Sequence, residues 1–388
     1  MSAPRSVHLL THEFYPRRGG IATYTLGLAL AAAEAGYETH VWAPQAHELS
    51  AQDWPFTIHE LPFPGREDWS DRWALRRTLR SAAVDWRQAQ ICLVDPGPLR
   101  LWLYQPWLDL PQPAALSLVL HGSELNRCIR WPHRHLLLKA LLRRARRVGV
   151  VSNYVGHTYL RHYAARPGQL VRVPGAPLPG FQQVQAEREE HPRLRLLTVA
   201  RIHRRKGQHR VMQALGLLPP DLRRRWDYLI VGPSRDTAYR SELERLARQH
   251  GLRVNFAGAV PDAALPQFYA AADVFVLASE PHGASVEGLG LVLLEAAAAG
   301  LPVLGTRTGG IPEAVAHNVN GLLVSPGNVT ALAAALERLT TDTALRHRLG
   351  QAGPEWVRTH FSWQRNVQAL FSDDVPPPCN FPPATGSN

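Results

Sequence analysis

Two glutamates, eight positions apart, are the residues of this chain whose type and spacing point most directly to chemistry. Glu287 is predicted to lie just before a helix and Glu295 about one and a half turns into it, with Gly288 and Gly290 at the turn between them. The other residues of this stretch are mostly apolar, so the helix is expected to be largely buried. A helix N-terminus presents unpaired N–H groups that suit a phosphate, and carboxylates accept hydrogen bonds from hydroxyls. The combination predicts a site for a nucleotide sugar.

A cluster of cations lies in the same half of the chain. The predicted strand 194–200 is followed by Arg201 and then by Arg204, Arg205 and Lys206. An arginine fork and a lysine point charge can hold a diphosphate between them. When these residues are taken alone, a solvated basic loop is the better explanation. Their place in the same predicted domain as the two glutamates favours the phosphate interpretation.

In the first half of the chain, two short motifs follow predicted strands. Gly19 and Gly20 come directly before a predicted helix, where glycines let the backbone approach a ligand closely. A plain turn is the alternative. His121 and Gly122 follow the strand predicted at 116–120, at the edge of a parallel sheet where such folds bind ligands. A capped structural histidine is the alternative for His121.

Short apolar runs alternate with helical patterns along almost the whole chain, which predicts parallel sheets covered on both faces. The predicted strands of the first half are 6–11, 38–43, 89–95, 116–121, 148–152 and 170–174. Those of the second half are 194–201, 227–232, 253–258, 273–279, 302–306 and 321–325. The clearest helical patterns are 20–35, 207–217, 237–250, 262–272 and 328–339. The expected fold is α/β, with two Rossmann-like, doubly wound domains.

The domain boundaries follow from changes in composition. We expect an N-terminal domain at 1–180, a polar linker at 181–193 and a C-terminal domain at 194–355. A helix at 356–371 is expected to pack back on the first domain. The proline-rich tail at 372–388 is expected to be disordered.

Composition narrows the class of protein further. The chain has 388 residues, 45% of them hydrophobic, which suffices for two or three domains. The three cysteines lack metal-ligand spacing, and neither a secretory leader nor a transmembrane run is evident, so we expect a cytoplasmic protein. The net charge of +11 suits anionic partners. Nucleic-acid-binding motifs, a P-loop, paired aspartates and metalloprotease motifs are absent, so we expect no nucleic-acid partner and no metal.

Two predicted helices, at 134–148 and 69–86, carry basic stripes. Their basic residues are Lys139, Arg143, Arg146 and Arg147 in the first, and Arg72, Arg76 and Arg80 in the second. Such helices can rest on anionic lipid, here at the inner face of the plasma membrane. A charged stripe is also the ordinary solvated side of a packed helix.

Together these motifs resemble glycosyltransferase family 4, a group of retaining enzymes with the GT-B fold, in which two Rossmann-like domains face each other across a cleft. The resemblance covers residues 5–371 and is strongest in the second half. The matching segments are 198–201, 206–207, 256–258, 272–277, 287–295, 309–313 and 321–326.

The resemblance implies a role for each matching residue. Glu287 would meet hydroxyls of the transferred sugar, and Glu295 would hold the nucleotide ribose. Gly19 and Gly20 would lie beside the phosphates, and His121 near the donor sugar. The groups implied on the diphosphate are the Arg201 and Lys206 side chains and the backbone amides of Gly290 and Leu291.

The resemblance also implies the reaction. A hexose of the mannose or glucose type would pass from GDP-mannose or a UDP-hexose to an acceptor hydroxyl by same-face attack, with the leaving phosphate accepting the proton. No cofactor or metal is expected, and the run 286–290 is typical of some mannosyltransferases that use GDP-mannose. The acceptor would be a saccharide or a lipid-linked molecule of the cell envelope.

Several alternatives remain open at this point. One is a GT-B phosphorylase or a sugar-nucleotide epimerase. Another is a non-enzymatic, basic protein that binds polyanions through its net positive charge.

Overall fold

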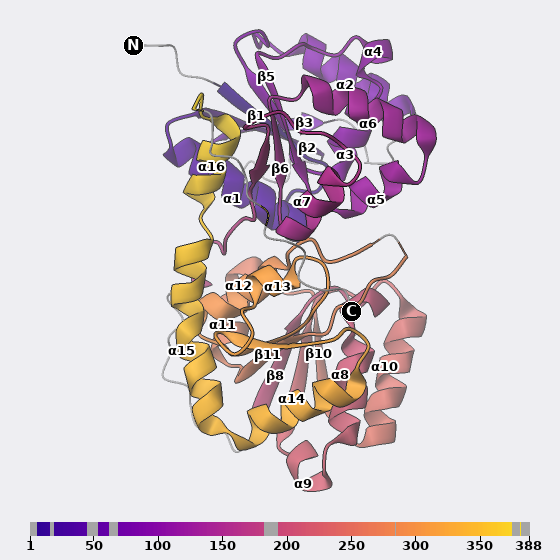
Figure 1. Ribbon diagram of the computed structural model, residues 1–388, viewed down its shortest axis with the longest axis vertical. Helices are drawn as coiled ribbons and strands as arrows, with labels where there is room; N and C mark the ends of the chain where they lie inside the picture. The colour runs from indigo at the N-terminus through magenta and orange to yellow at the C-terminus, as the bar shows by residue number, and fades with distance from the viewer. Residues whose placement is uncertain are drawn as a thin grey trace. The chain divides into compact units, whose positions relative to one another are not determined.

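The computed structural model describes residues 6–15, 19–44, 53–61, 69–181, 193–283, 285–374 and 381. The chain forms two compact units. Unit 1 comprises Met1–Gly175 and Phe361–Asn388, and unit 2 comprises Ala176–His360 (Figure 1). The expected linker falls almost wholly outside the described residues, and so does most of the expected tail.

Unit 1 is built on a parallel sheet of seven strands, in the order β3-β2-β1-β4-β5-β6-β7 within the described residues. The strands are β1 (Ser6–Leu10), β2 (Glu38–Pro44), β3 (Thr57–Leu61), β4 (Gln90–Leu93), β5 (Ala115–Leu120), β6 (Arg147–Val150) and β7 (Leu170–Arg172). The helices are α1 (Gly20–Glu34), α2 (Trp69–Ser81), α3 (Pro96–Trp102), α4 (Gln105–Leu108), α5 (Ser123–Ile129), α6 (Pro132–Arg144), α7 (Asn153–Leu160) and α16 (Trp363–Phe371). Because β1 lies inside the sheet and the order reverses beside it, the unit is doubly wound.

The last helix, α16, belongs to unit 1 although it follows unit 2 in the sequence. Figure 1 shows α16 in yellow beside the indigo α1. The Trp363 ring meets the Tyr24 ring edge-on, with centroids 5.1 Å apart. A Cβ at Gly27 would come within 2.2 Å of the Trp363 ring, so this glycine leaves room for the indole against α1.

In the described part of unit 2, six parallel strands form a sheet in the order β10-β9-β8-β11-β12-β13. The strands are β8 (Leu194–Val199), β9 (Trp226–Val231), β10 (Arg253–Gly258), β11 (Val274–Leu277), β12 (Val303–Thr306) and β13 (Gly321–Val324). The helices are η3 (Arg204–Lys206), α8 (Gln208–Leu217), α9 (Pro220–Arg223), α10 (Thr237–His250), η4 (Asp262–Ala264), α11 (Leu265–Ala270), α12 (Leu291–Ala298), α13 (Ile311–Ala314), α14 (Val329–Thr341) and α15 (Thr343–His360).

A single hydrophobic core holds one face of the unit 2 sheet to α8, α10 and α14. The fully buried Leu196 and Ile230 of the sheet share this core with Val211 of α8, Leu243 of α10 and Leu336 of α14. The strands therefore have little choice of register, since each apolar side chain must face this core or the helices opposite.

Some sequence-based expectations differ from the structure in unit 1. The helix expected at 69–86 ends at Ser81, and the helix of unit 1 expected at 356–371 begins only at Trp363. The edge strand β3 was not predicted, because its sequence, Thr-Ile-His-Glu-Leu, contains too few apolar residues to resemble a strand buried on both faces. The basic helix expected at 134–148 ends at Arg144, and Arg147 lies in β6 with only 6% of its surface exposed. Its guanidinium donates to the carbonyls of Gly168 and Asp374, and Arg146 pairs with Asp373. These two arginines are therefore not part of a solvated stripe.

Candidate active site

The turn before α12 in unit 2 holds Glu287, and Glu295 lies within α12 itself. The turn follows β11, and Gly290 caps the helix in the left-handed conformation, with φ of +88°. The main chain at Glu287 is fixed from the neighbouring turn, where the Gly310 N–H donates to its carbonyl at 3.0 Å. A Cβ at Gly309 would lie 2.0 Å from the same carbonyl, and φ at Gly309 is +56°. Glycine is therefore needed at 309 for the two turns to meet.

Glu287 is held by the cations that follow β8. Its Oε2 accepts hydrogen bonds from Lys206 Nζ at 2.6 Å, from Arg205 at 2.8 Å and from Ser279 Oγ at 3.3 Å. Only 12% of its side chain is exposed. Burial alone would raise the pKa of Glu287, but the adjacent Lys206 and Arg205 outweigh it and lower the pKa to about 2. The carboxyl group is therefore ionised across the whole physiological range.

Lys206 is buried beside this carboxylate. Burial lowers its pKa, Glu287 opposes that effect, and the charges of Arg205 and Arg201 lower the pKa further. Arg201 itself is exposed, and no ion-pair partner is found for it within the described residues. Lys206 and Arg205 thus share one carboxylate, with the charge of Arg201 acting on Lys206. The surplus of positive charge makes this end of unit 2 suitable for an anion.

A second glycine sets the position of the cations. Gly207 follows η3 and starts α8 with φ of +71°, and a Cβ there would lie 1.9 Å from the carbonyl oxygen of Ala278. This close approach brings the η3 cations to the end of β11, next to Ser279. Arg205 and Ser279 complete the cluster, and neither was assigned a role from the sequence. For Arg205 the signal was its position next to Lys206.

Glu295 lies in a different environment from Glu287. It is 5% exposed, and its Oε2 accepts a 2.7 Å hydrogen bond from the hydroxyl of Tyr269 on α11. Burial raises its pKa to about 7; the Tyr269 hydrogen bond opposes this shift and the charge of Asp262 adds to it. No hydrogen bond or shared partner links the two glutamates among the described residues. Nothing in the local sequence could have identified Tyr269, because it lies on another helix.

The sequence-predicted residues of unit 1 lie at the carboxyl ends of its strands and at the start of α1. Gly19 is the N-cap of α1, and Gly20 has open space where a Cβ would stand. His121 follows β5, its Nε2 lies 2.9 Å from the carbonyl of Val94, and its ring meets Tyr24 edge-on. His121 is thus anchored by its Nε2.

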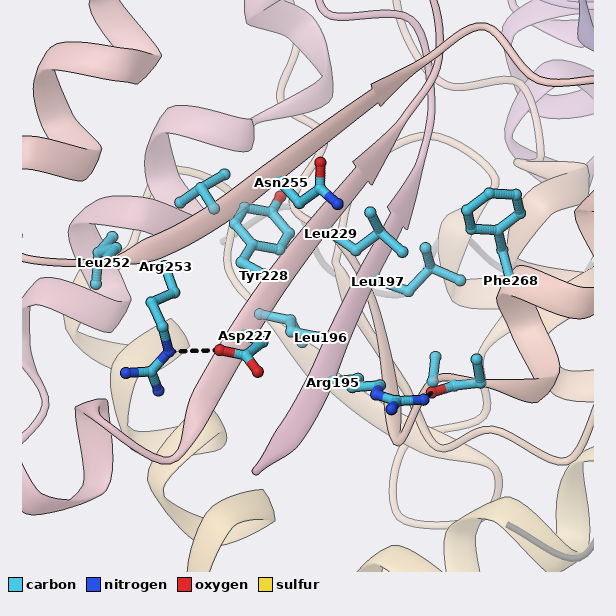
Figure 2. Close-up of a pocket in the computed structure, with 13 residues that line it drawn as sticks. Arg195, Leu196, Leu197, Asp227, Tyr228, Leu229, Leu252, Arg253, Asn255 and Phe268 are labelled. Atoms are coloured by element: carbon cyan, nitrogen blue, oxygen red, sulfur yellow. Dashed lines mark hydrogen bonds and ion pairs between the residues drawn. The ribbon is translucent and has the colours of Figure 1, made fainter. Parts of the chain in front are cut away.

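A pocket of unit 2 lies away from these residues. It has a volume of about 580 Å³ and includes Arg195, Asp227 and Arg253 at the amino ends of β8, β9 and β10 (Figure 2). Figure 2 shows Leu197, Leu229 and Phe268 lining one side of it and the Arg253–Asp227 ion pair at the other. None of the predicted site residues lines this pocket.

Within the described part of the chain, no helix combines the length and apolar character needed to cross a bilayer. Among the same residues, histidine, cysteine and acidic side chains nowhere gather in a group that could hold a metal ion.

The two parallel α/β units and the cation-lined start of α12 define the class of GT-B glycosyltransferases. The Anabaena protein HepE, solved in complex with UDP and glucose, has the same fold: the TM-score is 0.71 and the identity 19%, over 94% of this chain and 97% of that one. The family model "Glycosyltransferase Family 4" matches residues 18–176, and "Glycosyl transferases group 1" matches residues 181–356. The chain belongs to glycosyltransferase family 4 and is a glycosyltransferase.

Two curated relatives align over nearly their whole length. The GDP-mannose-dependent alpha-(1-6)-phosphatidylinositol monomannoside mannosyltransferase of Mycobacterium tuberculosis is 31% identical, covering 92% of this chain and 94% of the relative. The GDP-mannose-dependent monoacylated alpha-(1-6)-phosphatidylinositol monomannoside mannosyltransferase of Corynebacterium glutamicum is 28% identical, covering 94% and 96%.

Proposed function

We propose that this enzyme transfers mannose from GDP-mannose to a hydroxyl of a lipid-linked, phosphoinositide-type glycolipid, with retention of configuration. The observation that carries the proposal is the Glu287 carboxylate bound by Lys206 and Arg205 at the start of α12. The names of the full-length relatives support the donor and the acceptor class. Retention is supported because those relatives form alpha linkages and the mannose of GDP-mannose is itself alpha-linked.

In the proposed complex, Glu287 and the cations bind different parts of the donor. All three hydrogen bonds that Glu287 accepts within the described residues fall on Oε2, which leaves Oε1 to accept from a hydroxyl of the mannose. Lys206, Arg201 and the amides of Gly290 and Leu291 would bind the diphosphate and stabilise the charge that develops on it as the glycosidic bond breaks.

Glu295 would accept a hydrogen bond from the ribose, deeper along α12. Its pKa near 7 means that ligand binding can change its ionisation at neutral pH. Gly19 and Gly20 would let the start of α1 approach the phosphates. These assignments use only side chains and backbone amides, so we propose that transfer needs no metal, and we expect full activity in the presence of a chelator.

A lipid-linked acceptor requires contact with a membrane, which we propose occurs at the inner face of the plasma membrane. The α2–α4 aromatic surface, defined as Trp69, Trp73, Tyr104 and Trp107 with Arg72 and Arg76, supports this. Its three tryptophans are at least half exposed, and the two arginines lie over their rings at 4.6 and 5.3 Å. Exposed tryptophans beside arginines are typical of membrane interfaces.

The membrane proposal is tested by sedimentation with vesicles that contain anionic lipid. The double variant Trp73→Ala/Trp107→Ala is expected to lose most of its binding. Leu217→Ala, which removes an equally exposed apolar side chain from unit 2, serves as the control and is expected to bind normally. Equal sedimentation of both variants would exclude this surface as the contact.

The donor is tested by thermal shift and then by turnover. GDP-mannose is expected to raise the melting temperature more than UDP-glucose or ADP-glucose, because a ligand that binds only the folded state stabilises it. Purified enzyme with a phosphatidylinositol monomannoside acceptor is then expected to release GDP and form an alpha-linked product. Release of GDP without any acceptor, or a larger shift with another donor, would contradict the proposal. Mannose 1-phosphate as the product would instead indicate a phosphorylase.

A further inference from the structure

The hydroxyl of Tyr269 meets Glu295 inside unit 2, and the proposed function has given this tyrosine no role. Tyr269 lies on α11 and Glu295 on α12, and the tyrosine Oη donates to Glu295 Oε2 at 2.7 Å. The Tyr269 side chain is fully buried, and Glu295 is 5% exposed. The hydrogen bond is therefore shielded from water, which strengthens it relative to the same contact at a surface.

The position of the hydroxyl is set by aromatic packing around the Tyr269 ring. The ring stacks on Phe275 of β11 with centroids 5.7 Å apart and planes inclined by 24°. Phe181 meets the same ring edge-on, with centroids 5.4 Å apart. Because two rings hold it, Tyr269 keeps its hydroxyl in place independently of the hydrogen bond to Glu295.

The hydrogen bond occupies one carboxylate oxygen of Glu295 and leaves the other. Within the described residues, Oε1 accepts no hydrogen bond, and it is not one of the fully buried polar atoms there. Oε1 is thus the oxygen that a ligand can reach. A carboxylate that is fixed through Oε2 presents Oε1 in one direction, as a binding group must for a ligand hydroxyl of fixed position.

The same contact decides which group carries the proton. Burial, with the charge of Glu295 added, raises the pKa of the Tyr269 hydroxyl well above its ordinary value, so the tyrosine stays protonated and donates. Its hydrogen bond opposes the effect of burial on the pKa of Glu295, whereas the charge of Asp262 in η4 adds to it. Among the described residues, these two groups are the titratable ones that act on Glu295.

We propose that Tyr269 is the positioning residue of Glu295: its hydroxyl directs Oε1 toward the nucleotide ribose and extends donor binding to lower pH. Tyr269 itself does not touch the donor. Without the hydroxyl, the Glu295 anion loses a hydrogen bond and turns more freely, so both the affinity for the donor and its dependence on pH change. This inference rests on the proposed binding of the ribose by Glu295.

The test compares two variants that each remove one buried hydroxyl. Tyr269→Phe keeps the ring, and the pH at which GDP-mannose affinity falls is expected to move up by about one unit. The affinity at pH 7 then drops about 5-fold, because the ionised fraction of Glu295 falls from half to about one-tenth. Tyr228→Phe is the matched control: its hydroxyl bonds Thr198 Oγ1 at 2.9 Å in the core of the same unit, and it should keep the wild-type profile.

A double-mutant cycle separates positioning from packing. In a Glu295→Gln background, Tyr269→Phe is expected to change donor affinity much less than in the wild type, because the tyrosine acts through the carboxylate. Equal losses in both backgrounds would show that Tyr269 acts through its ring or on the donor itself, and would overturn the inference.

A measurement without donor completes the test. Glu295→Gln should gain melting temperature over its parent until the pH reaches the folded pKa of Glu295, near 7 in the wild type. In the Tyr269→Phe background this gain should continue to a pH about one unit higher. If the wild type binds no nucleotide sugar, the proposed function fails. If the wild type binds GDP-mannose and Tyr269→Phe behaves like Tyr228→Phe, this inference alone fails.

Discussion

The raised pKa of Glu295 predicts that donor binding depends on pH. If the nucleotide ribose donates hydrogen bonds to this carboxyl, GDP-mannose binds the ionised form more tightly than the protonated form. In the empty site the pKa is about 7, because the side chain is buried and Asp262 repels its charge. Binding must therefore remove a proton from part of the population at neutral pH, and this costs affinity as the pH falls.

The magnitude follows from that pKa. With a value of 7, about nine-tenths of the carboxyl groups are ionised at pH 8, half at pH 7 and about one-tenth at pH 6. If only the ionised form binds, the affinity falls about 2-fold from pH 8 to pH 7 and about 10-fold from pH 8 to pH 6, or about 1.4 kcal/mol. At pH 7, binding should release about half a proton per site.

Isothermal titration calorimetry with GDP-mannose measures both quantities. The sugar nucleotide is preferable to GDP, whose terminal phosphate titrates in the same range. Two buffers with different ionisation enthalpies give the number of protons released. Glu295→Gln is the control, and it should bind more weakly at pH 8 and show no such slope. A wild-type affinity that is flat between pH 8 and pH 6, or a slope that survives in Glu295→Gln, would refute the assignment.

Although Glu295→Gln should weaken donor binding, the same raised pKa predicts that it stabilises the unliganded protein at high pH. A folded pKa of about 7, against an ordinary value of 4.5, means that stability present below pH 4.5 is lost as the pH rises through 7. The loss is at most about 3 kcal/mol, since each pKa unit corresponds to about 1.4 kcal/mol. Glu295→Gln should therefore melt higher than the wild type at pH 8 but not at pH 4. Equal melting differences at both pH values would contradict a raised pKa.

Three other perturbations have defined outcomes. Glu287→Ala leaves Lys206 buried without its counter-charge and should lower the free energy of unfolding in urea by about 3 kcal/mol. The double variant Glu287→Ala/Lys206→Met should recover much of that loss. If the effects of the two substitutions are additive, the ion pair does not stabilise the protein in this way. Gly207→Ala should cost more than 1 kcal/mol, because φ is +71° and the added Cβ meets Ala278, and an unchanged melting temperature would show that the turn relaxes. Burial beside other histidines lowers the pKa of His8 to about 3, so the stability of the protein should fall as the pH drops below 6.5, by about 2 kcal/mol at pH 5. His8→Phe should weaken this dependence of stability on pH. If the variant unfolds in acid with the same pH profile as the wild type, His8 is not the source of the dependence.

The sequence predicted the elements whose signal is local. Among the residues that the structure describes, twelve of the thirteen strands were expected near their observed positions, because each is a short apolar run between helical patterns. The exception, β3, is an edge strand in which three of the five residues are polar. The basic helix was predicted to continue too far, to residue 148. Arg147 donates hydrogen bonds to carbonyls that are distant in sequence, and the sequence alone cannot distinguish such an arginine from one in solvent.

The candidate site was predictable only in part. The turns at Gly207 and Gly290 and the nearby charges were visible, because glycine and charge are local features. The hydrogen bond between Lys206 and Glu287 could not be predicted, because the two residues lie 81 positions apart. From the sequence, they were assigned to different parts of the ligand.

The two glutamates show how one residue type acquires two functions within a single turn and helix. Glu287 meets Lys206 and Arg205, its pKa falls to about 2, and it is a permanent anion. Glu295 meets a tyrosine hydroxyl in an apolar interior, its pKa rises to about 7, and its charge depends on what binds there. In the proposed complex, the hydrogen bonds from Lys206 and Arg205 to Glu287 would already orient these cations, so that little reorganisation would be needed when a diphosphate binds. Removing Glu287 should therefore disturb the diphosphate cations as well as the sugar, and its loss should affect transition-state stabilisation more than ground-state donor affinity.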